Sequence, residues 1–286
     1  MKIGIDSYCY HRFFGEIYSG LETDPGTRMN VWDFLDRAAS LKVAGVSLES
    51  CFFGDIDDGM VARLRARLDE LGLERVWAWG HPRGLASGAA PEQAADLIRH
   101  LALAARLGAG VMRICAGGRA TRPASWKVHR AAVLPLLREL VGPAEEHGVV
   151  LAVENHIDLL ADEMLDLITT INSPWLGVCL DTANNIRMFE EPLEVVAKLA
   201  PYARATHVKD VTTRRGDPKT FAFWPSTPLG EGLIDIPEVF SLLKRNGYQG
   251  LLALELDYLD PRYELDAAVQ QSIDAMRVWL NAHETQ

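Results

Sequence analysis

Short apolar runs and longer amphipathic segments alternate along the whole chain. Runs that are apolar on both faces predict buried strands, and apolar residues spaced by three or four predict helices. The expected strands cover residues 2–5, 45–49, 75–79, 110–115, 149–154, 176–181, 204–208 and 250–256. The expected helices cover residues 31–42, 57–72, 91–108, 126–148, 161–171, 192–200, 236–247 and 264–280. Eight strands that are each followed by a helix predict one domain, a single (β/α)₈ TIM barrel over residues 1–286.

Two connections are longer than the others, and both follow strands. Residues 6–30 follow the first strand and residues 210–235 follow the seventh. In a barrel such loops lie at the C-terminal ends of the strands, so we expect them to close over the mouth and to determine substrate choice. A doubly wound open sheet is the alternative, but the segment GIDSYCY after the first strand lacks the glycine-rich phosphate turn of that fold.

Four of the expected strands end in residues that can bind a metal. The fifth, sixth and seventh strands end in Glu154, Asp181 and His207, and the last ends in Glu255. Alternate residues of a barrel strand point inward, so these four side chains are expected in one ring at the mouth. The residues two positions earlier on the same faces are small: Ala152, Cys179, Ala205 and Ala253.

Three carboxylates and one imidazole at one desolvated site point to a cation. Like charges repel there and raise one another's pKa values, and a divalent ion removes that cost. Three oxygen ligands and one nitrogen suit Mn²⁺, Mg²⁺ or Co²⁺, whereas Zn²⁺ more often comes with Cys or more His. The alternative for each residue taken alone is a strand cap or a pair with a neighbouring Lys or Arg.

Two further residues share inward faces with the four. His156 lies two residues after Glu154, and we expect it to transfer protons without binding the metal, because four ligands are already supplied. Its alternative is a hydrogen bond that supports the site. Lys209 lies two residues after His207 and would stabilise an oxyanion or bind a carboxylate; a pair with Asp210 or Asp181 is its alternative.

Other strands contribute candidates for substrate binding. Arg113 on the fourth strand and Glu49 at the end of the second are expected to pair beneath the site, because an unpaired buried charge is costly. Trp77, Trp79 and His81 on the third strand are expected to alternate inward, where aromatic walls would stack on a sugar ring. Trp79, His81 and Arg113 are therefore candidate substrate-binding residues.

The composition of the chain argues against nucleic acids and membranes as binding partners. The net charge of −10 opposes a nucleic-acid groove and argues against anionic membranes. No apolar run approaches the length of a membrane span, and the N-terminus has no apolar segment typical of a secretory signal. The four cysteines are far apart without a CxxC motif, as in a reducing compartment. We expect a cytoplasmic enzyme with a small-molecule, sugar-like substrate; a homo-oligomer stays open.

The segments VENH, CLDTAN, THVKD and ALEL, with PLGEGLID between the last two, support a resemblance. They resemble the sugar phosphate isomerase/epimerase superfamily of xylose isomerase-like TIM barrels over essentially the whole chain. The resemblance implies that Glu154, Asp181, His207 and Glu255 hold one divalent metal, most often manganese. It also implies that Glu154 and Glu255 act as the acid and base groups of ketose epimerases.

The chain departs from the ketose 3-epimerases of that superfamily at three positions. Asn184 stands where they have a His three residues after the metal-binding Asp, and Leu160 stands where they have a second Glu. Their substrate Arg follows the metal-binding His, and here Arg214 and Arg215 are close but out of register. Asn184 and Arg214 are the candidates for the corresponding substrate contacts.

Three functions follow from these residues. The first is an isomerase or epimerase of a ketose or sugar-like polyol that works through a metal-stabilised enediolate, with Glu154 or Glu255 removing the proton. The second is a lyase on the same intermediate: a keto-inositol dehydratase, a 3-oxo-glycoside eliminase like a C-glycoside deglycosidase, or an oxo-sugar-acid decarboxylase. His156 and Lys209 favour this second function. The third is a non-enzymatic sugar-binding barrel.

Overall fold

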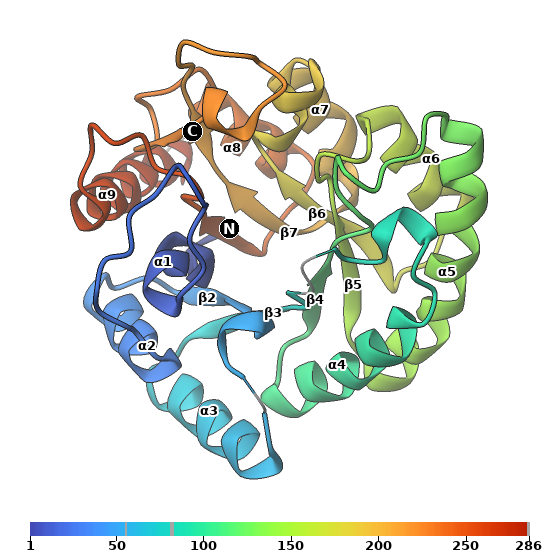
Figure 1. The fold of residues 1–286 in the computed structure, drawn as a ribbon. Helices are drawn as coiled ribbons and strands as arrows, with labels where there is room; N and C mark the ends of the chain where they lie inside the picture. Colours follow the sequence, from blue (N-terminus) through green and yellow to red (C-terminus); the bar gives the residue numbers. More distant parts are fainter. Residues whose placement is uncertain (55, 81–82, 285–286) are drawn as a thin grey trace.

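The computed structural model describes residues 1–54, 56–80 and 83–284. Eight parallel strands close into a barrel in the order β1-β10-β7-β6-β5-β4-β3-β2, and helices surround it (Figure 1). The barrel strands are β1 (Lys2–Asp6), β2 (Gly45–Glu49), β3 (Glu74–Ala78), β4 (Val111–Ile114), β5 (Val150–Glu154), β6 (Leu176–Asp181), β7 (Ala203–Val208) and β10 (Leu251–Leu254). The expected (β/α)₈ TIM barrel is confirmed.

The outer ring consists of the amphipathic helices that the apolar spacing predicts. They are α2 (Val31–Ser40), α3 (Asp58–Glu70), α4 (Gln93–Leu107), α5 (Trp126–His147), α6 (Ala161–Ile171), α7 (Pro192–Leu199), α8 (Ile236–Arg245) and α9 (Leu265–Glu284). Gly108 and Gly148 end α4 and α5 with φ of 78° and 64°, a left-handed conformation that favours glycine. Within the described part of the chain, no helix has the length and apolar character needed to cross a membrane.

The core has two layers. The larger layer lies between the strands and the helices and contains the outward-facing residues, such as Val153 and Leu254. A smaller cluster fills the inside of the barrel: Val76, Ala152, Cys179, Ala205 and Leu251. Ala152, Cys179 and Ala205 in this cluster are small residues that were expected to face inward. The polar residues two positions later on β5, β6 and β7 lie on the same faces and therefore meet at one mouth of the barrel.

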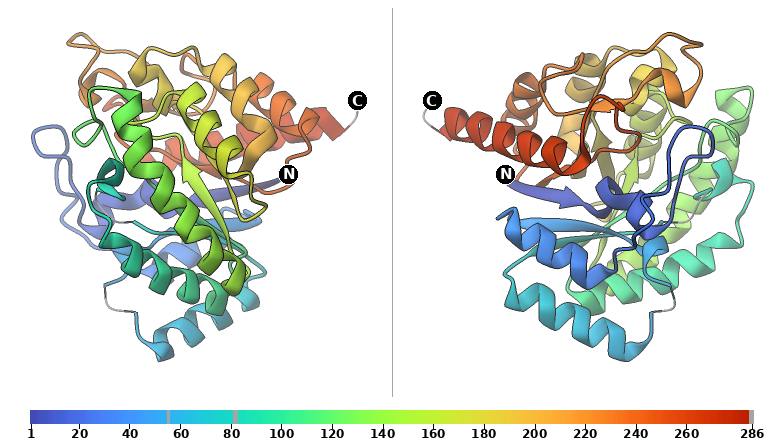
Figure 2. Two further views of the ribbon diagram at one scale, coloured as in Figure 1. Left: turned by 90° about the vertical axis from the view of Figure 1, so that its right-hand side faces the viewer. Right: turned by 60° about the vertical axis from the view of Figure 1, so that its left-hand side comes forward.

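The two long loops both reach that mouth, as expected. The first contains η1 (Ser7–Tyr10) and α1 (His11–Phe14), and it lies on the side of the barrel away from the two chain termini (Figure 2). The second contains β8 (Asp210–Val211), which pairs antiparallel with β9 (Ser226–Thr227), and η6 (Phe221–Phe223). The rings of Tyr18 and Phe221 lie 4.7 Å apart between centroids, so the loops meet. Four short 3₁₀ turns complete the elements: η2 (Ser50–Phe52), η3 (Ala86–Gly88), η4 (Asn184–Met188) and η5 (Ala200–Tyr202).

One buried carboxylate organises the PLGEGLID segment of the second loop. The amides of Gly230, Gly232 and Ile234 donate to the two carboxylate oxygens of Asp210 at 3.0, 2.9 and 3.1 Å. A Cβ atom at Gly232 would lie 2.1 Å from Asp210 Oδ1, so this close approach requires glycine. The loop is thereby held beside the end of β7, where His207 and Lys209 lie.

Candidate active site

The four predicted metal-binding residues meet at the C-terminal ends of the strands. Glu154 and Asp181 are the last residues of β5 and β6, His207 lies in β7 directly opposite Asp181, and Glu255 follows β10. Ligand atoms of Glu154, Asp181 and His207 lie within 4.8 Å of one another. Glu255 Oε2 lies 3.0 Å from His207 Nδ1. These four residues, called the quartet below, are all buried.

The quartet fits a divalent cation. Three of its buried atoms have no hydrogen-bond partner among the described residues: Asp181 Oδ2, His207 Nδ1 and Glu255 Oε2. The short contact between His207 and Glu255 has ion-pair distance without the direction of a hydrogen bond. The two oxygens lie 3.2 Å from Lys209 Nζ without a hydrogen bond, and carboxylate oxygens beside an imidazole nitrogen are the ligands that such an ion takes.

Two nitrogen donors hold the carboxylate of Glu154. Arg113 donates from Nε to Oε2 at 2.5 Å, and Asn184 donates from Nδ2 to Oε1 at 2.8 Å. Burial by itself would raise the pKa of Glu154, but the charges of Arg113 and His207 outweigh burial and lower it to about 2. The guanidinium of Arg113 also lies 3.2 Å from Glu49, which confirms the expected buried pair.

Lys209 supplies a positive charge to the same cluster. Its Nζ lies 3.2 Å from Asp181 Oδ2, 3.2 Å from Glu255 Oε2 and 3.1 Å from Asp257 Oδ2. Burial would lower the pKa of Lys209, but Asp181 and Asp257 outweigh it and raise the pKa well above the usual value. Burial likewise opposes the ionised form of Glu255, yet Lys209 and His207 hold its pKa well below the usual range. These contacts thus favour the ammonium form of Lys209 and the ionised form of Glu255.

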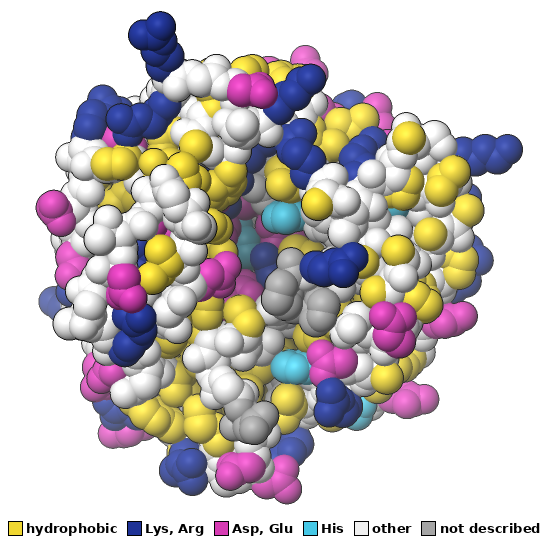
Figure 3. All heavy atoms as spheres, viewed as in Figure 1, with side chains coloured by type: hydrophobic (Ala, Val, Ile, Leu, Met, Phe, Trp, Pro, Cys, Tyr) yellow, Lys and Arg dark blue, Asp and Glu magenta, His cyan; other side chains and the backbone are white. Residues whose placement is uncertain are grey.

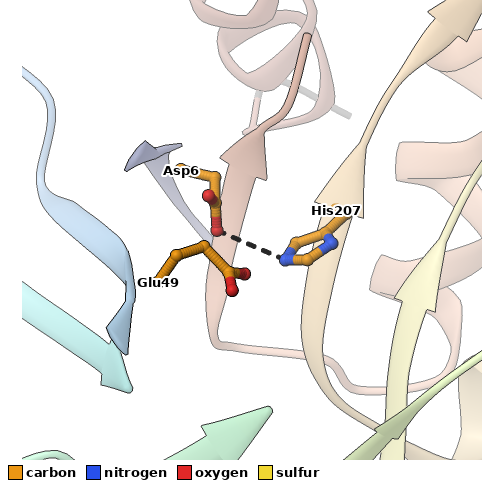
Figure 4. Close-up of side chains that lie close together, drawn as sticks. All are labelled: Asp6, Glu49 and His207. Carbon is orange, nitrogen blue, oxygen red and sulfur yellow. Dashed lines mark ion pairs between the residues drawn. The ribbon is translucent and has the colours of Figure 1, made fainter. Parts of the chain in front are cut away.

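A second acidic group lies behind the ring of His207. Asp6, the last residue of β1, places Oδ2 3.4 Å from His207 Nε2, and Glu49 projects from β2 beside them (Figure 4). Asp6 Oδ1 accepts the amide of Tyr8 at 2.6 Å. Burial raises the pKa of Glu49 to about 8, although Arg113 opposes the shift. The sequence analysis did not identify Asp6 as a site residue, because the expected first strand stopped at residue 5. Asp6 is nevertheless a polar residue at the end of a strand, like the members of the quartet.

The ring of His156 is oriented by the backbone. Its Nδ1 lies 2.8 Å from the carbonyl oxygen of Gly117. A carbonyl only accepts, so Nδ1 carries the proton and Nε2 of the neutral ring keeps its lone pair. No hydrogen bond to Nε2 occurs among the described residues, and the side chain lines the cavity described below.

The mouth cavity is the hollow above the quartet, with a volume of about 610 Å³. Figure 3 shows His, acidic and basic side chains together in this hollow. The first loop contributes Tyr8 and Tyr18, and the second contributes Phe221. Glu154, Glu255, Lys209, Arg113, Asn184 and His156 also line it, so six of the predicted residues meet here.

Arg187 lines the cavity as well and was not found from the sequence. It lies in η4, six residues after Asp181, and donates from one terminal nitrogen to Asp257 at 3.0 Å. Its guanidinium carbon lies 4.4 Å from the centroid of the Phe221 ring. Nothing in the local pattern NNIRMFEE distinguishes this arginine from a solvent-facing one.

The structure corrects two expectations about substrate binding. Trp77 and Trp79 face outward, because their indole N–H groups donate to His100 and Asp96 of α4 at 3.1 and 2.8 Å. Val76, the residue before Trp77, is on the opposite face of β3 and points into the barrel. The expected inward orientation of both tryptophans is therefore wrong, and Trp79 does not line the mouth cavity.

Arg214 also lies elsewhere. Its guanidinium is 3.2 Å from Asp260, its side chain is 40% exposed, and it does not line the mouth cavity. The described part of the chain thus offers Arg187, from the loop after β6, in place of the arginine expected after β7. His81 lies outside the described residues, so its predicted role stays a prediction.

Relatives of this chain are carbohydrate enzymes of several reaction classes. It is 26% identical to a 3-oxo-isoapionate decarboxylase of Pectobacterium atrosepticum over 64% of this chain and 62%, less than two thirds, of that protein. It is 29% identical to a 2-epi-5-epi-valiolone 7-phosphate 2-epimerase of an Actinoplanes species over 80% of this chain and 81% of that one.

A solved structure and a family model cover the fold. An L-ribulose 3-epimerase structure superposes with a TM-score of 0.75 at 18% identity, covering 99% of this chain and 96% of that one, which shows the shared fold. The family model described as xylose isomerase-like TIM barrel matches residues 35–280. The superfamily expected from the strand-end motifs is therefore confirmed, and the chain belongs to the xylose isomerase-like TIM barrel family.

Proposed function

We propose that the chain is a divalent-metal-dependent lyase of a sugar-like oxo compound, with the quartet as the metal ligands. One observation carries the proposal: no described residue bonds to Nε2 of His156, whereas the two candidate glutamate bases are held by cations. His156 is then the one group proposed to transfer protons, and it lies on one side of the cavity.

The two glutamates are poor bases as they are placed. Both oxygens of Glu154 accept hydrogen bonds, from Arg113 and Asn184, and its pKa is lowered to about 2. Glu255 lies against Lys209 and His207, which lower its pKa well below the usual value. Proton abstraction from carbon needs a base with a free lone pair, and no described residue bonds to Nε2 of His156.

One proton-transfer group is sufficient for a lyase. A divalent ion bound by the quartet would polarise a carbonyl oxygen of the substrate. In a dehydration, His156 Nε2 takes the proton from the carbon beside the carbonyl and returns it to the hydroxyl that leaves as water. In a decarboxylation, protonated His156 gives its proton to the carbon that loses CO₂. Lys209 would stabilise negative charge on a substrate oxygen in either case.

Isomerisation or epimerisation is the second candidate. Epimerisation needs one group to remove a proton and another to return it on the opposite face. Glu154 and Glu255 both line the mouth cavity, and this observation favours the second candidate, as does the relative named as an epimerase. The relative named as a decarboxylase supports the lyase.

A substrate panel separates the two candidates. Ketoses, inososes, 3-oxo-glycosides and oxo-sugar acids are incubated with the Mn²⁺-loaded protein in deuterated water. We expect loss of water, aglycone or CO₂ from one class, measured by NMR and by CO₂ release. Formation of an epimer, or deuterium exchange into recovered substrate without net elimination, would overturn the lyase in favour of the second candidate.

The variant His156→Ala tests whether His156 transfers the proton. We expect turnover to fall about 10²–10⁴-fold, the usual size of general acid–base effects, while Mn²⁺ content is unchanged. The matched control is His147→Ala, because His147 is at the far end of α5 and outside the mouth cavity. Loss of metal would make His156 a ligand or its support, and retained turnover would return the proton transfer to Glu154 and Glu255.

A further inference from the structure

One wall of the mouth cavity carries two arginines that form no ion pair with the quartet among the described residues. Arg119 lies in the loop after β4 and Arg187 in the turn after β6, and both line the cavity. His156, after β5, lies on the same side, and its Nδ1 bonds to Gly117 in the Arg119 loop. The wall formed by Arg119 and Arg187 is called the arginine wall below.

Arg187 is buried with unused donor capacity. Its side chain is 4% exposed; one terminal nitrogen donates to Asp257 at 3.0 Å and to the carbonyl of Trp224 at 3.3 Å, and the other donates to Asn184 Oδ1 at 3.4 Å. Its Nε is buried and has no hydrogen-bond partner among the described residues. A buried donor without a partner costs free energy, so a ligand group that reaches this nitrogen would be stabilised there.

Arg119 differs from Arg113 and Lys209 in its partner. Arg113 contacts Glu49 and Glu154, and Lys209 contacts three carboxylates. Arg119 is exposed and donates to the carbonyl oxygen of Arg187 at 2.5 Å. It makes no ion pair with a carboxylate in the described part of the chain, so its positive charge is available to a ligand in the cavity.

The first loop has the opposite chemical character. The hydroxyl of Tyr8 donates to Glu16 at 2.8 Å and lies 2.7 Å from the hydroxyl of Tyr18. All three residues line the mouth cavity. Hydroxyl and carboxylate groups suit the hydroxyls of a polyol and disfavour an anion, so a substrate with one acidic end is oriented with that end toward the arginine wall.

We propose that the substrate carries a carboxylate, which binds to the arginine wall beside His156. The proposal rests on the proposed function, because it names the substrate class of the same site. Guanidinium groups match a carboxylate with paired N–H donors. A phosphate would usually be met by free backbone amides, but the amide of Gly118, next to the Gly117 carbonyl that the His156 ring contacts, donates to Thr121 Oγ1 at 2.9 Å.

Equilibrium binding tests the proposal without turnover. D-Erythronate, erythritol and D-erythritol 4-phosphate share a four-carbon skeleton, and each is titrated by calorimetry into the Mn²⁺-loaded and the metal-free protein. We expect the acid to bind at least about tenfold more tightly than the polyol in both forms, as for hydrogen bonds to a charged group. Arg119→Met should remove this preference without changing erythritol binding.

The control is Arg262→Met, because Arg262 is an exposed arginine that pairs with Asp260 outside the mouth cavity. It should leave all three affinities unchanged. An acid preference that needs Mn²⁺ and survives Arg119→Met would overturn the proposal, because the carboxylate would then bind the metal. Tighter binding of the phosphate, lost in Arg119→Met, would overturn the carboxylate in favour of a phosphate. Neither result changes the outcome of the substrate panel, so the two proposals fail separately.

Discussion

Asp6 is placed to influence how His207 would bind the proposed metal. A metal-binding imidazole nitrogen must be unprotonated, so His207 can bind through Nδ1 only with its proton on Nε2. Asp6 Oδ2 lies 3.4 Å from Nε2, at ion-pair distance without the direction of a hydrogen bond, and its negative charge favours this form. The change Asp6→Asn keeps an oxygen for the amide of Tyr8 but replaces the second oxygen with an NH₂ donor. A donor facing Nε2 favours the proton on Nδ1, where it blocks the ion.

The magnitude follows from the geometry. Losing the partner of a metal-binding histidine typically costs about 10–100-fold in affinity. The 3.4 Å separation is longer than that of a strong charge-assisted hydrogen bond, so we expect the lower end of that range. A weakening of about tenfold corresponds to about 1.4 kcal/mol of binding free energy.

Calorimetric titration of Mn²⁺ into metal-free protein measures this change, with electron paramagnetic resonance of bound Mn²⁺ as a second readout. The matched control is Asp57→Asn, because Asp57 also caps a helix with its side chain, at the start of α3. The control should leave Mn²⁺ affinity unchanged. An unchanged affinity in Asp6→Asn, with thermal unfolding like that of the parent protein, would refute the reasoning.

Two further changes test the site and its surroundings. Asp181→Asn should lower metal content and activity together, because it removes one carboxylate of the quartet; full occupancy by elemental analysis with normal turnover would contradict the quartet. Burial raises the pKa of Asp158 from 3.8 to about 6, so the folded state holds this proton more tightly than the unfolded state. Stability therefore falls by about 3 kcal/mol as the pH rises from about 4 through about 6. Asp158→Asn should be more stable than the parent in urea at pH 8 and similar at pH 4; the same difference at both pH values would contradict this explanation.

The amino-acid sequence by itself determined the barrel and most of the residues that line its mouth. Eight apolar runs separated by helical patterns are sufficient to predict parallel strands, because each strand is buried on both faces. The quartet could be placed because its members end strands whose inward residues are small, as at Ala152, Cys179 and Ala205. Parallel strands end on the same side, so local position along each strand was enough to bring these side chains together.

Only the tertiary structure decided which face of β3 points inward, and which distant groups contact the quartet. Side chains of a strand point alternately to its two faces. When both faces are apolar, nothing in the sequence marks the inner face, so Trp77 and Trp79 were assigned to the wrong side. Arg113 and Asn184 at Glu154, Asp6 at His207, and the arginine wall depend on contacts between residues far apart in the chain. Such contacts set the pKa and the free lone pairs of each group, because Coulomb forces and burial act through space and not along the sequence.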